Sequence, residues 1–222
     1  MKIKIKPYMI LIVIIVLVIG GIIYFLSGDR YMSVLNFHHE APLQNGDIIF
    51  HTSTSSQSKA IQLATNSPYS HMGIIYIKDN KPYVFEAVQP VKLTPFNTWI
   101  KRGQNASYVI KRVKNADELL TPDVKDKMKA AAEKYIGKDY DLYFEWSDDR
   151  IYCSELVWKI YKEAADIEIG KTEPLSNFDL SNEIVKQQMK ERYGNKIPVN
   201  KQVISPVSMF NSDKLITVEN NY

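Results

Sequence analysis

The sequence predicts one domain that combines β-strands with α-helices, behind an apolar segment at the N-terminus. Runs rich in β-branched and aromatic residues, which are typical of strands, lie mainly in the first half of the domain, at residues 47–52, 71–77, 82–88 and 108–113. Helical periodicity is clearest after Cys153, where apolar residues recur at three- and four-residue spacing: Leu156, Val157, Ile160, Tyr161 and Ala164. These patterns predict a mixed fold in which one helix begins at or just after Cys153.

The N-terminal segment has the pattern of a membrane anchor. Residues 1–7 are a basic head, and residues 8–26 form a run of 19 residues without charge, just long enough to span a hydrocarbon core of ~30 Å. Lysines before the run predict a cytoplasmic N-terminus and an extracytoplasmic C-terminal domain. A cleaved signal peptide is the alternative, although the run is long and no A-x-A-like site follows. Residues 27–41 are expected to be a juxtamembrane linker, and residues 42–222 the folded domain.

Composition excludes several classes of protein. The chain has 28 basic and 25 acidic residues, and without Lys2, Lys4 and Lys6 the balance is even, so no basic footprint for nucleic acid is present. The single cysteine excludes an intrachain disulfide and a cysteine-based zinc site. No HExxH, GxSxG, GxGxxG or P-loop motif occurs, so neither a metal nor a nucleotide cofactor is expected. The sequence does not predict an oligomeric state.

The first half of the domain reads as strands separated by turns and one short helix. Turn residues 42–46 precede the first strand, and a serine-rich tract leads into a short helix at residues 59–66, which Pro68 follows. The strands at 71–77 and 82–88 are joined by a turn at 78–81, which predicts an antiparallel hairpin. Residues 91–100 are expected to form a loop.

The second half reads mainly as helices. Pro122 after Thr121 is a good helix start, and Gly137 is a good end for that helix. Residues 138–150 form an aromatic-rich loop, which the helix after Cys153 follows. Residues 166–178 are expected to be a loop, and Asp179 or Ser181 to cap a last amphipathic helix that ends near Tyr193.

Cys153 is the candidate nucleophile. At a helix N-terminus, unpaired backbone N–H groups and the helix dipole favour thiolate over thiol, and the thiolate is the reactive form. A buried structural cysteine is the alternative interpretation. A thiol redox protein is disfavoured because the chain has no second cysteine to resolve a disulfide.

His71 is the candidate base, and Glu86 is its candidate partner. If the hairpin turn centres on Asp79 and Asn80, residue 78 pairs with residue 81, and residues 71, 73, 84, 86 and 88 share one sheet face. Glu86 then lies diagonally from His71 and can orient the imidazole. A bulge of one residue would turn Glu86 to the other face. His51 is a rival base without an obvious carboxylate partner.

Several segments together resemble a known enzyme family. LQNGDIIF, KAIQLATNSPYSHMGIIY, YVFEAV, GKDYDLYF and YCSELVWKIY are similar to the circularly permuted NlpC/P60 cysteine hydrolases, most closely to their YiiX/YebB-like branch. The resemblance covers roughly residues 42–165. It implies a papain-like α+β fold, in which the cysteine helix packs on an antiparallel sheet. It also implies Cys153 as nucleophile, His71 as base and Glu86 as the third polar residue.

The resemblance leaves the substrate open. It implies a cysteine hydrolase that cleaves an amide, ester or thioester bond. Together with the membrane anchor expected from residues 1–26, this predicts an outward-facing enzyme with a cell-wall peptide as the expected substrate. The alternatives are a lipid acyl hydrolase or acyltransferase, and a binding module that has lost turnover. Tyr69, Tyr140 and Tyr152 are expected to contact the substrate, and the aromatic loop with Tyr143, Phe144 and Trp146 to line part of the cleft. Residues 166–200 match no motif of the family.

Overall fold

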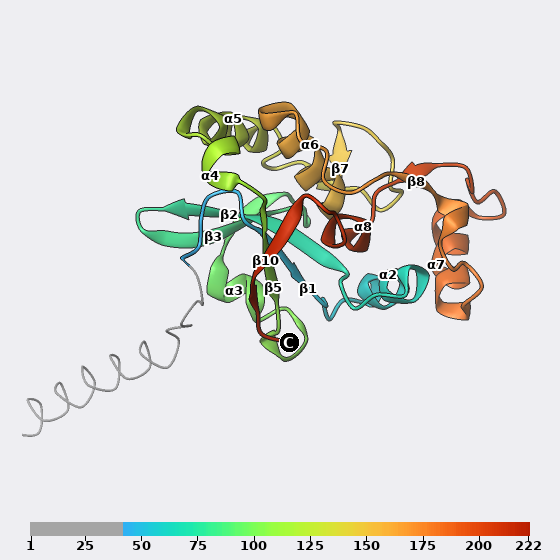
Figure 1. Ribbon diagram of the computed structural model, residues 1–222. Coiled ribbons are helices and arrows are strands. Elements are labelled where there is room, and N and C mark those ends of the chain that lie inside the picture. The colour runs from blue at the N-terminus through green and yellow to red at the C-terminus, as the bar shows by residue number, and fades with distance from the viewer. Residues whose placement is uncertain (1–41) are drawn as a thin grey trace, which may run out of the picture. The chain divides into compact units, whose positions relative to one another are not determined.

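The computed structural model describes residues 42–222, which form a six-stranded sheet with helices on both faces (Figure 1). The strand order is β10-β5-β1-β2-β3-β4, and every neighbouring pair is antiparallel. The strands are β1 (Ile48–His51), β2 (His71–Lys78), β3 (Lys81–Glu86), β4 (Lys92–Pro95), β5 (Val109–Val113) and β10 (Leu215–Asn220). The sequence placed the first, second, third and fifth of these strands correctly.

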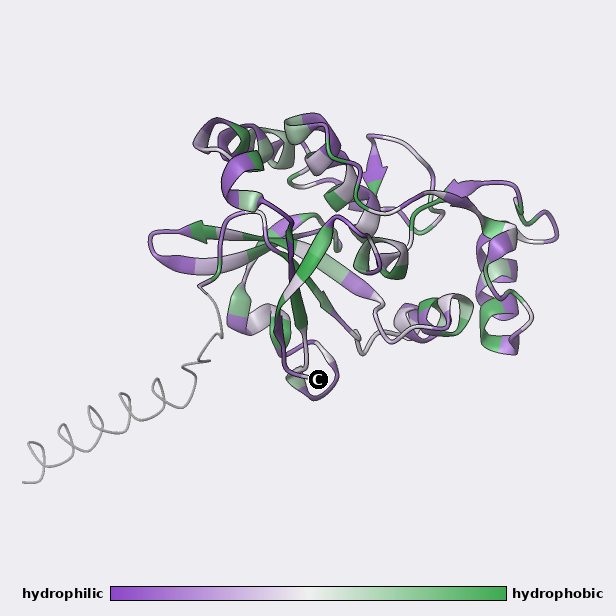
Figure 2. Cartoon of the chain, in the orientation of Figure 1, coloured by the Kyte–Doolittle hydropathy of each residue, from purple (hydrophilic) through white to green (hydrophobic). Residues whose placement is uncertain are grey.

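Side chains that alternate in direction along the strands form two apolar cores, one on each face of the sheet. Ile48, Phe50, Met72 and Ile74 belong to the larger core on one face. Their neighbours along the strands belong to a smaller core on the other face, with Ile49, Ile75, Val84 and Ile110 from the sheet and Trp99 from helix α3 (Phe96–Ile100). Because successive side chains of a strand point to opposite faces, the burial of both sets fixes the register of the sheet. Figure 2 shows the hydrophobic colour on the central strands and the hydrophilic colour at the tip of the β2–β3 hairpin.

Two helices that pack against each other cover the larger core. Helix α5 (Pro122–Glu133) packs against α6 (Cys153–Ala165), and α6 packs against β2. Thr121 caps α5, its hydroxyl accepting a hydrogen bond from the N–H of Val124, and Pro122 occupies the first turn, as the sequence predicts. Helix α6 begins at Cys153 and buries its apolar stripe, including Leu156, Val157 and Ile160, in the same core. The expected packing of the cysteine helix on an antiparallel sheet is therefore observed.

A smaller helical pair lies beside the sheet. Helix α2 (Ser56–Thr65) contacts α7 (Glu183–Tyr193), which belongs to the part of the chain without a recognised motif. Asn182 caps α7 through its side chain, so the expectation of a cap at Asp179 or Ser181 is wrong by one to three residues. The stretch expected to be a loop at 166–178 includes strand β8 (Glu173–Pro174), which pairs with β9 (Gln202–Val203), and a 3-10 turn at Leu175–Asn177.

The expected loop at residues 91–100 is the largest difference between sequence and structure. Strand β4 and helix α3 occupy it, because β4 pairs with β3 and the apolar residues of α3 cover the smaller core. The remaining elements are short: α4 (Ala116–Leu119), β6 (Asp139–Tyr140), β7 (Arg150–Ile151), α8 (Pro206–Phe210) and the 3-10 turn Gln104–Ala106.

The expected basic head, membrane anchor and linker lie at residues 1–41, outside the residues that the structure describes. Within residues 42–222, no helix has the length and apolar character needed to cross a bilayer.

Candidate active site

The sulfur of Cys153 lies at the first residue of helix α6. Tyr152 is the N-cap and has extended backbone angles, and the side chain of Glu155 reaches back to the N–H of Tyr152 at 3.4 Å. The backbone N–H groups of Ser154 and Met72 hydrogen-bond to the sulfur. Helix α6 thus brings Cys153 to the beginning of β2, although the helix covers one face of the sheet and His71 belongs to the other.

His71 connects Cys153 to Glu86. Its Nε2 donates to Glu86 Oε2 at 2.7 Å, and its ring also hydrogen-bonds to the sulfur of Cys153, which leaves Nδ1 for that contact. The hairpin register is the expected one, since Lys78 pairs with Lys81 and Ile74 with Phe85. Gly73 permits the close approach of β3, because a Cβ at this position would lie 2.5 Å from Val84 Cγ1.

The charges of this group stabilise one another. Burial alone would lower the pKa of His71, but the hydrogen bonds and charges of Cys153 and Glu86 raise it to about 9. Burial alone would likewise raise the pKa of the Cys153 thiol, yet the hydrogen bond and charge of His71 bring it below its ordinary value. The site therefore favours a thiolate–imidazolium pair at neutral pH.

Glu86 is fully buried and remains ionised. Burial would raise its pKa, but the hydrogen bond and charge of His71, the hydroxyl of Thr94 and the charge of Arg102 lower it to about 2. Its second oxygen, Oε1, accepts from Thr94 Oγ1 at 2.6 Å and from Arg102 Nη2. Thr94 and Arg102 flank α3. Thr94 lies in the segment 91–100 that the sequence predicted to be a loop, and Arg102 follows that segment. The polar Thr94 within a run of β-type residues was the only available signal.

His51, the rival base, faces His71 across the β1–β2 pair but has a different environment. The two residues are direct partners in the register, with ring centroids 5.4 Å apart. His51 stacks on Trp99 at 3.8 Å, is buried, and has no hydrogen-bond partner for Nδ1. Burial, and then the charges of His71 and Arg102, lower its pKa to about 2. The ranking of His71 above His51 therefore agrees with the electrostatics of the site.

Two of the three tyrosines expected to contact substrate lie beside Cys153. Tyr140 accepts a hydrogen bond from Gln57 Nε2 at 3.1 Å and also hydrogen-bonds to Cys153. The Tyr152 hydroxyl accepts from the N–H of Ile204 at 3.2 Å, and the ring contributes to the cavity next to Cys153. Tyr69 does not reach the site: it stacks on Phe210 at 3.9 Å.

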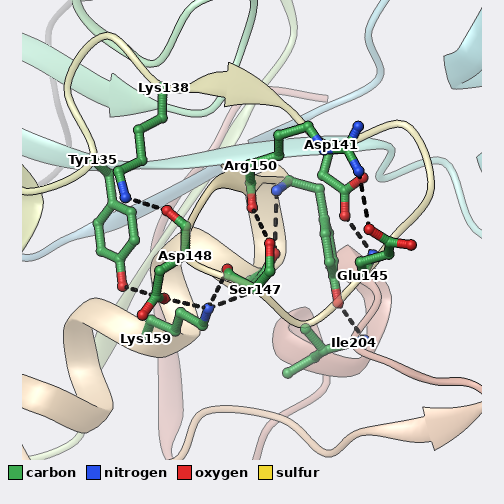
Figure 3. Close-up of polar contacts among 11 residues, drawn as sticks. Tyr135, Lys138, Asp141, Glu145, Ser147, Asp148, Arg150, Lys159 and Ile204 are labelled. Carbon is green, nitrogen blue, oxygen red and sulfur yellow. Dashed lines mark hydrogen bonds and ion pairs between the residues drawn. The ribbon is translucent and has the colours of Figure 1, made fainter.

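The aromatic loop between β6 and β7 is tied to helix α6 by polar contacts (Figure 3). Lys159 of α6 donates to Ser147 O at 2.6 Å and to Asp148 Oδ1 at 2.8 Å. Inside the loop, the buried carboxylate of Asp141 accepts from the N–H of Tyr143 at 2.8 Å. These contacts fix the loop that Tyr140 begins. Of the other aromatic residues expected in the cleft, Phe144 lines a cavity at Cys153, whereas Tyr143 and Trp146 are exposed.

Two cavities that differ in polarity lie at the reacting groups. The first is lined by Cys153 and mainly by apolar side chains of α2, the β6–β7 loop, the 3-10 turn Leu175–Asn177 and α7. The second is larger, about 590 Å³, is lined by His71, Arg102 and many hydroxyl and amide side chains, and lies on the other side of the site. Tyr140 lines both cavities. Sequence reasoning did not find the α7 wall of the first cavity, because its residues are distant in sequence from Cys153.

Comparison with known proteins agrees with this geometry. Residues 42–219 match the model of a family described as permuted papain-like amidase enzymes, YaeF/YiiX, C92 family. The chain belongs to this family. It is 50% identical over 175 residues to the uncharacterised protein YiiX of Escherichia coli K12, a match that covers 79% of this chain and 85% of that protein. A crystal structure of the metalloprotein YiiX from Escherichia coli O157:H7 superposes with a TM-score of 0.77 at 49% identity, covering 81% of this chain and 98% of that one.

The family assignment shows that the protein is a papain-like cysteine amidase with a permuted order of its segments. The expected resemblance is confirmed, and the C92 family is a narrower assignment than NlpC/P60. The YiiX crystal structure is that of a metalloprotein. Within residues 42–222, no cluster of three or more His, Cys, Asp or Glu side chains that could hold a metal ion is found. Both nitrogens of His71 are already engaged by Glu86 and Cys153.

Proposed function

We propose that this protein hydrolyses an amide bond through Cys153, His71 and Glu86. The observation that carries the proposal is the continuous hydrogen-bonded chain from the Cys153 sulfur through His71 to Glu86, at the N-terminus of a helix. This is the nucleophile, base and orienting group that covalent hydrolysis needs. Arg102 and Thr94 act through Glu86 and are positioning residues.

The chemistry proceeds in two halves. The Cys153 thiolate attacks the carbonyl carbon, the C–N bond breaks, and the His71 imidazolium gives its proton to the leaving nitrogen. Neutral His71 then takes a proton from water, the hydroxide attacks the thioester, and the carboxylic acid leaves as the Cys153 thiolate is restored. The Cys153 N–H and the Tyr140 hydroxyl lie near the sulfur, where they can donate to the developing oxyanion.

The apolar cavity favours a lipid-like acyl group over a cell-wall peptide. Its walls come from residues such as Ala60, Leu175, Val185 and Met189, and apart from Cys153 itself the only charged side chain among the described residues that line it is Arg192. Cell-wall peptides carry several charged groups, whose burial among apolar side chains is costly. We therefore place an amide of an apolar acyl group first among substrates. The cell-wall peptide expected from the sequence is second.

The substrate class can be tested directly. The protein is incubated with N-octanoyl amides and, separately, with muropeptides, and the products are identified by mass spectrometry. Octanoate released by the protein but not by Cys153→Ala supports the first class, whereas cleaved muropeptides with intact octanoyl amides reverse the order. Acyl transfer appears as a new acyl amide or ester when an acceptor amine or alcohol is added. Binding of both ligands without turnover indicates a non-catalytic module.

The location is proposed from the sequence alone. The lysines before residues 8–26 support an orientation with the catalytic domain outside the cytoplasm. The length of the apolar run and the lack of an A-x-A-like site after it support an anchor that is not cleaved. Protease added to intact cells should then digest the domain. A domain that is protected until the cells are lysed contradicts this topology.

A further inference from the structure

The polar cavity has no role in the reaction as described so far. It is the larger of the two cavities at the site, about 590 Å³, and this size is in the range of small-molecule sites. Residues from β1, α2, β2, the segment after β3 and the segment after α3 contribute to its wall. We therefore expect one part of the substrate to occupy this cavity.

The positions of Cys153 and His71 indicate which part of the substrate each cavity holds. Cys153 lines the apolar cavity and is absent from the wall of the polar one, and His71 lines the polar cavity and is absent from the wall of the apolar one. The acyl carbon becomes bonded to Cys153, and the leaving nitrogen receives its proton from His71. The acyl group must therefore extend into the apolar cavity, and the leaving amine into the polar one.

The wall of the polar cavity favours a group with hydrogen-bonding capacity. Four serines line it, of which Ser58 and Ser70 hydrogen-bond to each other at 2.5 Å, together with Thr54, Gln57, Gln89 and Tyr140. Among residues 42–222, no Asp or Glu side chain lines it, so a cationic group on the leaving amine would find no counter-charge there.

Arg102 supplies a positive charge to the same wall. Its side chain is 39% exposed, and its described hydrogen bond runs from Nη2 to Glu86. Its Nε is buried without a hydrogen-bond partner. The guanidinium thus keeps donors that Glu86 does not use, and Arg is the side chain best suited to bind a carboxylate.

We propose that the polar cavity binds the leaving amine and selects amines that carry a carboxylate, so that the substrates are N-acyl amino acids with an apolar acyl group. This inference rests on the proposed amidase function. It adds the identity of the second half of the substrate, which neither the family nor the catalytic group specifies.

The test compares three leaving groups on one acyl chain. The full-length protein in a non-ionic detergent is given N-octanoyl glycine, N-octanoyl ethanolamine and the N-octanoyl amide of N,N-dimethylethylenediamine, which are anionic, neutral and cationic. The expected order of kcat/KM is anionic, neutral, cationic, with at least about a tenfold preference for the glycine amide over the ethanolamine amide. Equal rates, or a preference for the cationic amide, overturn the inference.

Arg102→Gln examines the source of the preference. Because Arg102 also holds Glu86, this variant should slow every substrate, so the readout is the ratio of the glycine rate to the ethanolamine rate. That ratio should fall to near one in Arg102→Gln and be largely retained in Arg102→Lys. Lys101→Gln is the matched control, because Lys101 is exposed, precedes Arg102 and does not line the cavity. Its ratio should equal that of the unmodified protein, and an equal fall in Lys101→Gln contradicts a specific role of Arg102.

Failure of this inference differs from failure of the proposed function. If the ethanolamine amide is cleaved without any preference for glycine, the amidase proposal stands and the leaving-group assignment is wrong. If none of the three amides is cleaved although Cys153 reacts as a thiolate, the assignment of N-acyl amino acids is wrong. If, in addition, Cys153 fails to react with iodoacetamide in the folded protein, the amidase proposal also fails.

Discussion

The end of β1 and the beginning of β2 carry two histidines in nearly the same position but with opposite charge states. His51 and His71 are partners in the sheet register, both are buried, and both lie near Trp99. The pKa of His51 falls to about 2, and that of His71 rises to about 9. Burial acts in the same direction on both rings, so the difference comes from their partners.

The partners explain the contrast. His71 has the Glu86 carboxylate at 2.7 Å on one nitrogen and the Cys153 sulfur on the other, whereas His51 has an aromatic ring on its face and an unpartnered Nδ1. Once His71 is positively charged, it further disfavours a charge on His51. A histidine becomes a functional base through the carboxylate that faces it, and the number of buried histidines in a site is not by itself informative.

Removing each histidine should have very different effects on turnover. His71→Ala removes the proton donor and acceptor, and we expect kcat/KM to fall on the order of 10³-fold or more. His51→Ala should cost much less, because a neutral histidine without a sulfur contact moves no proton. Hydrolysis of an octanoyl amide by both variants measures the difference. Losses of equal size would mean that the two rings act together.

The pKa of the Cys153 thiol distinguishes the roles of the two histidines and can be measured without a substrate. Iodoacetamide should alkylate Cys153 at a rate that follows a thiolate titration, with a midpoint below the ordinary ~8.5. His71→Ala should raise this midpoint, since the imidazolium no longer stabilises the thiolate. His51→Ala should leave it nearly unchanged, because neutral His51 contributes no charge. A cysteine that reacts only after unfolding contradicts the ion pair.

The sequence predicted those parts of the site that depend on local secondary structure. A helix start at Cys153 follows from apolar spacing, and the position of Glu86 follows from the register that a two-residue turn imposes on a hairpin. Both are confirmed by the structure. The contact between Cys153 and His71 did not follow from spacing, because Cys153 begins helix α6 and His71 begins strand β2, two elements that are distant in sequence and meet only through the tertiary fold. The family resemblance supplied that part.

The predictions from sequence were wrong for segments whose structure depends on tertiary packing. Residues 92–100 carry few strand or helix signals, yet β4 completes the sheet and α3 covers its second core. Thr94, a partner of Glu86 that lies in this segment, was therefore missed, and Arg102, which follows the segment, was not predicted as a partner either. Tyr69 was expected to contact the substrate, but its ring packs on Phe210.

Replacing the carboxylate beside His71 should make it more similar to His51. In Glu86→Gln the charge that holds His71 protonated is absent, so the pKa of His71 should fall from about 9 and the alkaline limb of kcat/KM should move to lower pH. Turnover should fall about 10- to 100-fold, as for other residues that orient a reacting group. Thr94→Val is the matched control, because it removes one hydrogen bond to Glu86 and keeps the carboxylate. It should shift the limb less. An unchanged limb in Glu86→Gln would assign the orientation of His71 to another group.

The smallest expected effect concerns stability in mild acid. Between pH 6.5 and 5, His51 is neutral in the folded protein and protonated in the unfolded chain, so its contribution to stability falls as the pH falls. Glu155, whose pKa burial raises to about 7, contributes a slope of the opposite sign that all the variants below share. While Cys153 remains a thiolate, the folded pair of Cys153 and His71 holds one proton, whereas the two side chains together hold two in the unfolded chain. This difference makes the unfolding free energy fall further as the pH falls. Each proton contributes at most about 1.4 kcal/mol per pH unit.

Two substitutions separate the contributions of His51 and Cys153 to this pH dependence of stability. His51→Gln removes one titrating group, and Cys153→Ser removes the other, because a serine hydroxyl does not ionise in this range while His71 stays protonated in both states. Urea unfolding at pH 6.5 and pH 5 should show that each single variant loses less stability on acidification than the parent protein. The double variant should lose the least. If His51→Gln keeps the full slope, His51 is protonated in the folded protein, and the contrast between the two histidines is wrong.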